Sequence, residues 1–174
     1  MNDMLSEFIK YIEENRLCGR NDRILLGVSG GIDSMVMASL FVSAGFDTAI
    51  SHCNFCLRGR ESDEDEELVR RIASEYNVPF FTRRFETASH ARENGISVQM
   101  AARDLRYEWF ETIRSENNFD LIAIAHNLND NVETFLINLI RGTGLKGLSG
   151  MKPLSNRITR PLLFPTRQRI EEYC

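Results

Sequence analysis

Residues 24–34 read ILLGVSGGIDS, and this stretch constrains the fold more than any other part of the chain. The aliphatic run predicts a buried strand, the two glycines predict a tight turn, and Asp33-Ser34 before a second apolar run predicts the start of a helix. Such a turn presents backbone N–H groups beside the positive end of a helix dipole, which favours a bound phosphate. The lysine of the Walker pattern is missing, so backbone and hydroxyl groups must hold the anion.

A simpler explanation is that Asp33 or Ser34 only caps the helix. The setting of SGGxDS between a buried strand and a helix favours the phosphate site. Asp33 cannot bind phosphate directly because like charges repel, but its carboxylate can hold a Mg²⁺ ion that bridges to the phosphate. The nucleotide-binding residues expected in the turn are Ser29, Gly30, Gly31, Ile32, Asp33 and Ser34.

The rest of the chain alternates between strand and helix patterns. Strands are expected at residues 47–52, 79–83 and 119–125, with a short fifth strand at 158–159. The expected helices cover residues 4–17, 33–44, 61–76, 98–114, 129–141 and 166–173. This alternation predicts an α/β fold, a doubly wound, mainly parallel five-stranded sheet with helices on both faces. Ligands of such sheets bind beyond the carboxyl ends of the strands.

Two of these helices have distinct apolar faces. The inner face expected for the helix at 98–114 consists of Met100, Ala101, Leu105, Trp109 and Ile113. The helix at 129–141 has an apolar stripe formed by Val132, Phe135, Leu136, Leu139 and Ile140. We expect two parts: an N-terminal helix with the segment that leads into the first strand, at residues 1–22, and a catalytic domain at residues 23–174. The chain stops a few turns into its last helix, so we expect a fragment of a longer protein.

Charge is distributed unevenly along the chain. The net charge is −4, yet residues 134–170 contain no Asp or Glu and carry seven basic side chains. This asymmetry is expected when one face meets a polyanion, although a solvated loop region would show it too. The acidic N-terminus, the four unevenly spaced cysteines and the lack of a long apolar run predict reduced thiols, a cytoplasmic location and no membrane partner.

The segment AHNLNDNVET at residues 125–134 contains a second set of candidate site residues. His126 falls at the end of a strand, and Asp130 and Glu133 share one face of the helix that follows. Facing the phosphate loop, the two carboxylates could share Mg²⁺ or position a substrate amine. Alternatively, Asp130 and Glu133 form a capping box, and His126 is structural.

Arginines in the segment ARDLRYEWF are further candidates. Arg103 and Arg106 lie on one helical face, where they could stabilise charge on a transferred or leaving group. The simpler alternative pairs them with Asp104 or Glu108 at the surface.

The second predicted strand is followed by His52-Cys53-Asn54. Cys53-x-x-Cys56 could be half of a zinc or iron–sulfur site or a redox pair, but the ligand set is irregular, and two unconnected thiols fit better.

Together these segments resemble the N-type ATP pyrophosphatases, whose phosphate loop reads SGGxDS and whose fold is adenine nucleotide alpha hydrolase-like. More closely, they resemble the N-terminal PP-loop domain of the tRNA(Ile)-lysidine synthetase family. The matching pieces are SGGIDS, HCNFCLRGRESDED, AARDLRY, AHNLNDNVET, LIRGTGLKGLSGM and RPLL. The run from AHNLNDNVET to LSGM is the most specific of them.

The resemblance implies that ATP adenylates the C2 carbonyl oxygen of the wobble cytidine of tRNA(Ile) with a CAU anticodon, and that free L-lysine then displaces AMP to leave lysidine. It implies ATP contacts from the phosphate loop, His52 and His126, and Mg²⁺ at Asp33 or Asp130. Arg103, Arg106, Asp130 and Glu133 would join Asp33 in catalysis. The tRNA would face Arg141, Lys146 and Lys152. A homodimer is compatible with the resemblance.

Two departures from the family pattern stand out. Cys56 occupies a position where the family often has His. The family also has C-terminal domains that grip the tRNA body, and we expect this chain to lack them, to bind ATP and to recognise tRNA poorly. The rival interpretations are a tRNA thiolation enzyme that uses Cys53 and Cys56, a GMP or NAD synthetase, and a non-catalytic nucleotide- or RNA-binding module.

Overall fold

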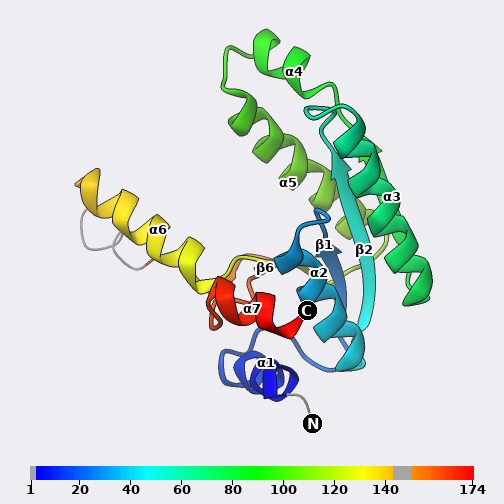
Figure 1. Ribbon diagram of the computed structural model, residues 1–174, viewed down its shortest axis with the longest axis vertical. Helices are drawn as coiled ribbons and strands as arrows, with labels where there is room; N and C mark the ends of the chain where they lie inside the picture. Colours follow the sequence, from blue (N-terminus) through cyan, green and yellow to red (C-terminus); the bar gives the residue numbers. More distant parts are fainter. Residues whose placement is uncertain (1–2, 143–149) are drawn as a thin grey trace.

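A computed structural model describes residues 3–142 and 150–174 of the chain (Figure 1). Its centre is a six-stranded sheet with the order β3-β2-β1-β4-β6-β5. The strands are β1 (Arg23–Gly27), β2 (Asp47–Asn54), β3 (Phe80–Arg84), β4 (Leu121–Ile124), β5 (Leu154–Ser155) and β6 (Ile158–Thr159). All neighbours pair in parallel except β5, which is antiparallel to β6. The predicted α/β class is confirmed.

The strand count is a correction: the prediction of five strands omitted β5. Strand β5 has only two residues, which pair with β6 across a turn. A strand this short has no alternating pattern that the sequence could show. The residues His52-Cys53-Asn54, expected after the second strand, form its last three positions, because β2 continues to Asn54 in register with β3.

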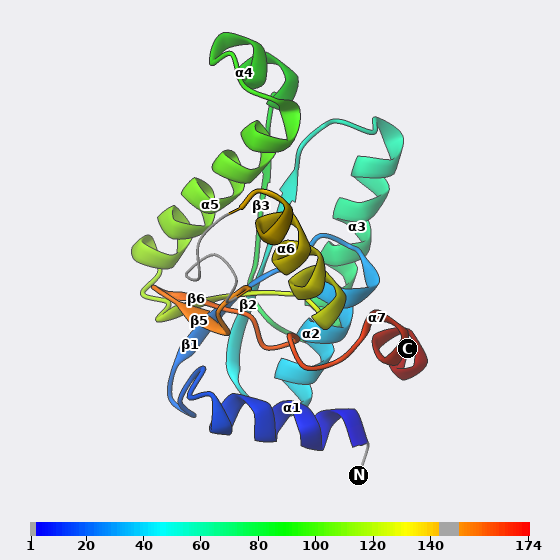
Figure 2. The same cartoon turned by 90° about the vertical axis from the view of Figure 1, so that its left-hand side faces the viewer.

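The helices are α1 (Asp3–Glu14), α2 (Ile32–Ser43), α3 (Arg60–Glu75), α4 (Thr87–Glu93), α5 (Val98–Glu116), α6 (Leu128–Ile140) and α7 (Arg167–Tyr173). Helix α4 was not predicted. Helices α1 and α4 lie at opposite ends of the molecule (Figure 2).

Alternating side chains of β1 enter two different cores, as expected for a strand buried on both faces. Ile24 and Leu26 pack with α1, α2 and α7, whereas Leu25 packs with α5. The side chains of α5 that reach this second core include Trp109, Phe110 and Ile113. Register along β1 therefore fixes both helical layers at once, because a shift by one residue would exchange the two faces.

Two of the predicted apolar faces differ from the structure. Met100, expected on the inner face of α5, is 53% exposed, whereas the next residue, Ala101, is fully buried. At 3.6 residues per turn, Met100 lies on about the opposite side of the helix from Trp109. Helix α6 projects from the body of the molecule and contains no buried residue, so its apolar stripe is exposed (Figure 1). The periodicity correctly indicated a helix, but it could not indicate what covers the apolar face. None of the described helices is long and apolar enough to cross a bilayer.

Gly27 provides a test of this packing. A Cβ at Gly27 would lie 2.6 Å from Cε2 of Phe110, whereas a Cβ at Gly19 would come no closer than 3.6 Å to any neighbour. We expect Gly27→Ala to lower the free energy of unfolding by about 1–3 kcal/mol, because the buried Phe110 ring must shift to make room. Gly19→Ala is the matched control and should be close to neutral. Denaturation midpoints in urea measure both effects; equal midpoints would mean that the ring moves without cost.

Candidate active site

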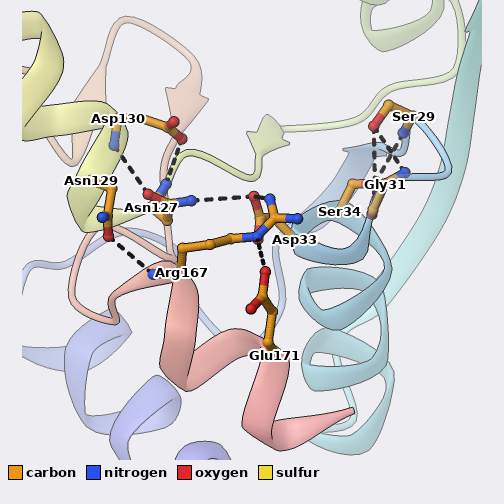
Figure 3. Close-up of polar contacts among 9 residues, drawn as sticks. All are labelled: Ser29, Gly31, Asp33, Ser34, Asn127, Asn129, Asp130, Arg167 and Glu171. Atoms are coloured by element: carbon orange, nitrogen blue, oxygen red, sulfur yellow. Dashed lines mark hydrogen bonds and ion pairs between the residues drawn. The ribbon is translucent and has the colours of Figure 1, made fainter.

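The phosphate loop leaves the carboxyl end of β1 and enters α2 through Gly30 and Gly31. The Val28 N–H donates to the Ser51 carbonyl at 2.9 Å, and Gly30 has φ +93°, a conformation that favours glycine. The Ser34 hydroxyl donates to the Gly31 carbonyl at 2.7 Å and accepts from the Ser29 N–H at 3.1 Å. These bonds fold the turn back on itself (Figure 3).

The suggestion that Asp33 or Ser34 caps α2 is wrong. The N-cap residue is Gly31, which has no side chain that could cap the helix, and its own N–H donates to the Ser29 hydroxyl at 3.3 Å. The first N–H groups of a helix have no acceptor within it, so α2 turns unsatisfied donors toward the loop. This is the geometry expected of an anion site.

Asp33 is held by groups from two other parts of the chain (Figure 3). Its Oδ2 accepts from Asn127 Nδ2 at 3.2 Å and from Arg167 Nη1 at 2.7 Å. Its Oδ1 is buried and has no hydrogen-bond partner among the described residues. A buried carboxylate oxygen without a donor is the feature expected where a cation or a ligand group completes the site.

His52 lies at the carboxyl end of β2 and is 2% exposed. Its Nδ1 is 2.9 Å from the Val28 carbonyl, which can only accept, so Nδ1 carries the proton and Nε2 has a free lone pair. Burial lowers the pKa of His52, so the ring is neutral at physiological pH. In the described structure, Nε2 has no partner, and His52 lines a cavity of about 200 Å³ beside Ser29 and Arg106.

Asp130 forms a capping box at the start of α6, but its partner is Asn127 and not Glu133. The Asn127 side chain accepts from the Asp130 N–H at 3.0 Å, and Asp130 Oδ2 accepts from the Asn127 N–H at 2.9 Å. Asn127 therefore joins the cap of α6 to Asp33. Glu133 makes no hydrogen bond or ion pair with the part of the chain that the structure describes, and it is exposed.

Two cavities meet at His126. The first, of about 230 Å³, lies between the ends of β1 and β4 and is lined by Ser29, Ser34, Cys53, Phe55, Arg106 and His126, among others. The second, of about 380 Å³, is lined by Arg103, His126, Asp130, Glu133, Thr134, Ile137, Met151 and Arg160. The structure thus brings together the candidates from the loop, from α5 and from α6. The order β2-β1-β4 reverses direction at β1, which is where doubly wound sheets bind ligands.

The predicted arginines of α5 stack on aromatic rings and do not pair with neighbouring carboxylates. The Arg106 guanidinium lies 5.3 Å from the centre of the Phe55 ring, and that of Arg103 lies 4.9 Å from the Tyr107 ring. Within the described residues, neither forms an ion pair with Asp104 or Glu108, so that alternative is wrong. Stacking leaves the N–H groups of both arginines available to an anion.

The basic segment after Thr134 is partly neutralised within the fold. Arg167 pairs with Asp33, and Arg169 pairs with Glu7 at 2.8 Å. Arg141 and Lys152, predicted to face tRNA, are exposed, while Lys146 lies outside the described residues.

The cysteines of the Cys53-x-x-Cys56 motif are both free thiols. Burial raises the pKa of Cys53 to about 12, and Cys56 is exposed. Over residues 3–142 and 150–174, no group of three His, Cys, Asp or Glu side chains could hold a metal ion.

Sequence reasoning missed Asn127, Arg160 and Arg167 as site residues. Asn127 had a local signal, since it directly precedes the helix that begins at Leu128. Arg160 was included only as the first residue of the RPLL segment and as one of the seven basic side chains of residues 134–170. Arg167 reaches Asp33 across 134 positions of sequence, which no local pattern reveals.

A doubly wound α/β sheet with a glycine-rich phosphate loop at its switch point defines a nucleotide-binding domain. The chain belongs to the PP-loop domain family, whose model matches residues 2–174.

Several curated relatives carry the name tRNA(Ile)-lysidine synthase. The protein from Bacteroides thetaiotaomicron is 45% identical over 165 residues, which are 95% of this chain and 39% of that protein. The protein from Petrotoga mobilis is 37% identical over 178 residues, which are 99% of this chain and 57% of that protein. This chain therefore spans roughly two fifths to three fifths of the length of these two relatives.

Solved structures show the same fold at lower identity. The U34-tRNA thiolase NcsA from Methanococcus maripaludis has a TM-score of 0.74 at 19% identity, over 97% of this chain and 62% of that one. The NH3-dependent NAD synthetase from Campylobacter jejuni has a TM-score of 0.65 at 16% identity, over 99% of this chain and 72% of that one. The adenine nucleotide alpha hydrolase-like fold is thereby confirmed.

His126 should make the stability of the fold depend on pH. Burial, assisted by the positive charge of Arg160, lowers its pKa from 6.5 to about 4. Between these values the unfolded chain binds more protons than the folded chain, so the free energy of unfolding should fall as the pH drops from about 6.5 to about 4. In His126→Gln this fall should be smaller, as measured by urea denaturation at several pH values. His90→Gln, on α4 and away from both cavities, is the control. An unchanged slope for His126→Gln would contradict this assignment.

Proposed function

We propose that this domain carries the catalytic site for lysidine formation on tRNA(Ile). ATP adenylates the C2 carbonyl oxygen of the wobble cytidine in the CAU anticodon and releases pyrophosphate; the ε-amine of free L-lysine then attacks C2 and displaces AMP. The observation that carries the proposal is the pair of cavities that meet at His126, one opening on the phosphate loop and the other containing two carboxylates and two arginines. The names of the relatives at 37–45% identity support it.

The first cavity suits ATP. Its apolar walls, which include Phe110 and Ile124, offer a surface for adenosine, and Ser29 and Ser34 direct the phosphates toward the first turn of α2. Arg106 reaches this cavity from α5, where its charge would stabilise the negative charge that develops as pyrophosphate leaves. The neutral ring of His52 offers Nε2 as a hydrogen-bond acceptor beside the loop.

Magnesium fits the donor set at Asp33, whose buried Oδ1 has no partner in the described structure. Mg²⁺ usually takes one or two carboxylates and completes its shell with phosphate oxygens and waters, so a single carboxylate beside a phosphate loop suffices. When bound there, the ion would neutralise charge on the triphosphate. Asp130 is a poorer candidate for the metal, because its Oδ2 accepts from the backbone of Asn127 and, in the described structure, it has no buried carboxylate oxygen without a partner.

The second cavity suits lysine and the cytidine. Glu133 and Asp130 supply negative charge for a lysine ammonium group, and Arg103 and Arg160 supply positive charge for the lysine carboxylate or the AMP leaving group. His126 separates the two cavities and remains neutral, so it can bridge them through hydrogen bonds without adding charge. Placing lysine beside the adenylated base turns the second step into a reaction within one site.

The tRNA would approach over the exposed side chains of Arg141 and Lys152. The reaction would take place in the cytoplasm, with Cys53 and Cys56 reduced. Sulfur transfer is a poorer explanation of the site. The thiolate is the reactive form of cysteine, and a thiol with a pKa of about 12 at Cys53 is protonated at neutral pH.

The two half-reactions provide a test with separate expectations. Asp33→Ala should abolish pyrophosphate release from ATP in the presence of tRNA, because the metal and phosphate site is lost. Glu133→Gln should retain pyrophosphate release without lysine but raise the KM for lysine about 10- to 100-fold, since it removes a charged hydrogen-bond partner. Glu93→Gln, an exposed carboxylate on α4, is the matched control.

Pyrophosphate release and lysine incorporation should be measured with purified tRNA(Ile), on this chain and on a full-length relative that carries the same substitutions. Retained pyrophosphate release in Asp33→Ala would refute its role. Equal loss of both half-reactions in Glu133→Gln would move Glu133 from the lysine site to the ATP site.

A further inference from the structure

Arg167 lies between two carboxylates that belong to different helices (Figure 3). It is the first residue of α7, and its Nη1 is 2.7 Å from Asp33 Oδ2 on α2. Its Nε is 2.8 Å from Glu171 Oε1, one turn further along α7. The start of α7 is fixed independently, because the Arg167 N–H donates to Asn129 Oδ1 at 3.0 Å. The guanidinium can therefore lose one carboxylate and remain paired with the other.

The contact falls on the carboxylate that the proposed function assigns to Mg²⁺. Oδ2 of Asp33 accepts from Asn127 and Arg167, and Oδ1 is buried without a described partner. The guanidinium places a positive charge directly beside the carboxylate that would hold the metal ion. A divalent cation arriving at Asp33 would meet this like charge within a few ångströms and be repelled by it.

We propose that Arg167 is a positioning residue that substitutes for the metal ion: it holds Asp33 while the site lacks Mg²⁺ and nucleotide, and it withdraws onto Glu171 when they bind. This inference rests on the proposed function, because it takes Asp33 as the metal ligand. Arg167 thereby sets the Mg²⁺ concentration at which Mg²⁺ and the nucleotide bind to the site.

The exposure of the three side chains supports such an exchange. The Asp33 side chain is 15% exposed, so leaving its charge unpaired would be costly. The side chains of Arg167 and Glu171 are 47% and 53% exposed, so this ion pair can move in water with little change in solvation. Asp33 is then paired in both states, first with a guanidinium and afterwards with the metal ion.

The exchange also links the site to the position of α7. With Arg167 on Asp33, the first turn of α7 is tied to the first turn of α2, and Asn127 ties the start of α6 to the same oxygen. Withdrawal of Arg167 releases one of these ties. By linkage, whatever strengthens the pair of Arg167 and Asp33 must weaken Mg²⁺ binding at Asp33, and bound Mg²⁺ must weaken that ion pair.

The test is the Mg²⁺ dependence of ATP binding, followed with a fluorescent ATP analogue and titrated MgCl₂ on this chain. Arg167→Gln keeps a polar side chain and removes the charge, so half-saturation should shift to about two- to fivefold less Mg²⁺. Arg167→Lys keeps the charge and should stay near the parent value. Glu171→Gln removes the second anchor, holds Arg167 on Asp33, and should shift half-saturation to more Mg²⁺.

Opposite shifts for Arg167→Gln and Glu171→Gln would establish the exchange. An unchanged or higher Mg²⁺ requirement in Arg167→Gln, with normal ATP binding by the parent chain, would overturn this inference and leave the proposed function standing. Absence of Mg²⁺-dependent ATP binding in the parent chain, or its full retention in Asp33→Asn, would overturn both.

Discussion

The parallel pairing of β1 on both of its edges is the constraint on which the rest of the molecule depends. Its register with β2 and with β4 fixes the sheet, and its alternating side chains fix one helical layer on each face. Since β1 continues into a turn at the edge of the sheet, its carboxyl end becomes the place where polar groups can gather without disturbing either core. The phosphate loop, the ends of β2 and β4, and the cavities between them all follow from that position.

The features that could be predicted from sequence are those with a local signal. Three such features are the aliphatic run before SGGIDS, the alternation of strands and helices, and the helical spacing in α5. They depend on near neighbours in the sequence, and they were sufficient to predict the fold class and most helix positions. The site could be predicted where residues of one motif share a strand end or a helix face, as His126, Asp130 and Glu133 do. The parallel sheet then brings the motifs to one edge.

The features that could not be predicted depend on distant parts of the chain. Nothing near Val132 or Leu136 shows whether the apolar side of α6 meets the core, and it is exposed in this structure. Nothing near Asp130 shows whether its partner is Asn127 or Glu133, since both spacings satisfy the capping pattern. The pairing of Arg167 with Asp33 depends on where α7 returns to the sheet, which only the tertiary structure specifies.

Buried polar atoms without a hydrogen-bond partner lower the stability of this fold, and they are concentrated near the candidate site. Apart from hydroxyls, which can rotate, the buried side-chain atoms without a partner in the described structure belong to Asp33, His52, His126 and Arg160. Asp33 lies in the first turn of α2, His52 near the end of β2, and His126 and Arg160 just after β4 and β6. Three of the four line the cavities at this edge of the sheet. Each unpaired group costs about 1–3 kcal/mol that a packed apolar residue would not. A ligand rich in charge and hydrogen-bonding groups, as a nucleoside triphosphate is, would offer partners to all of them at this one edge.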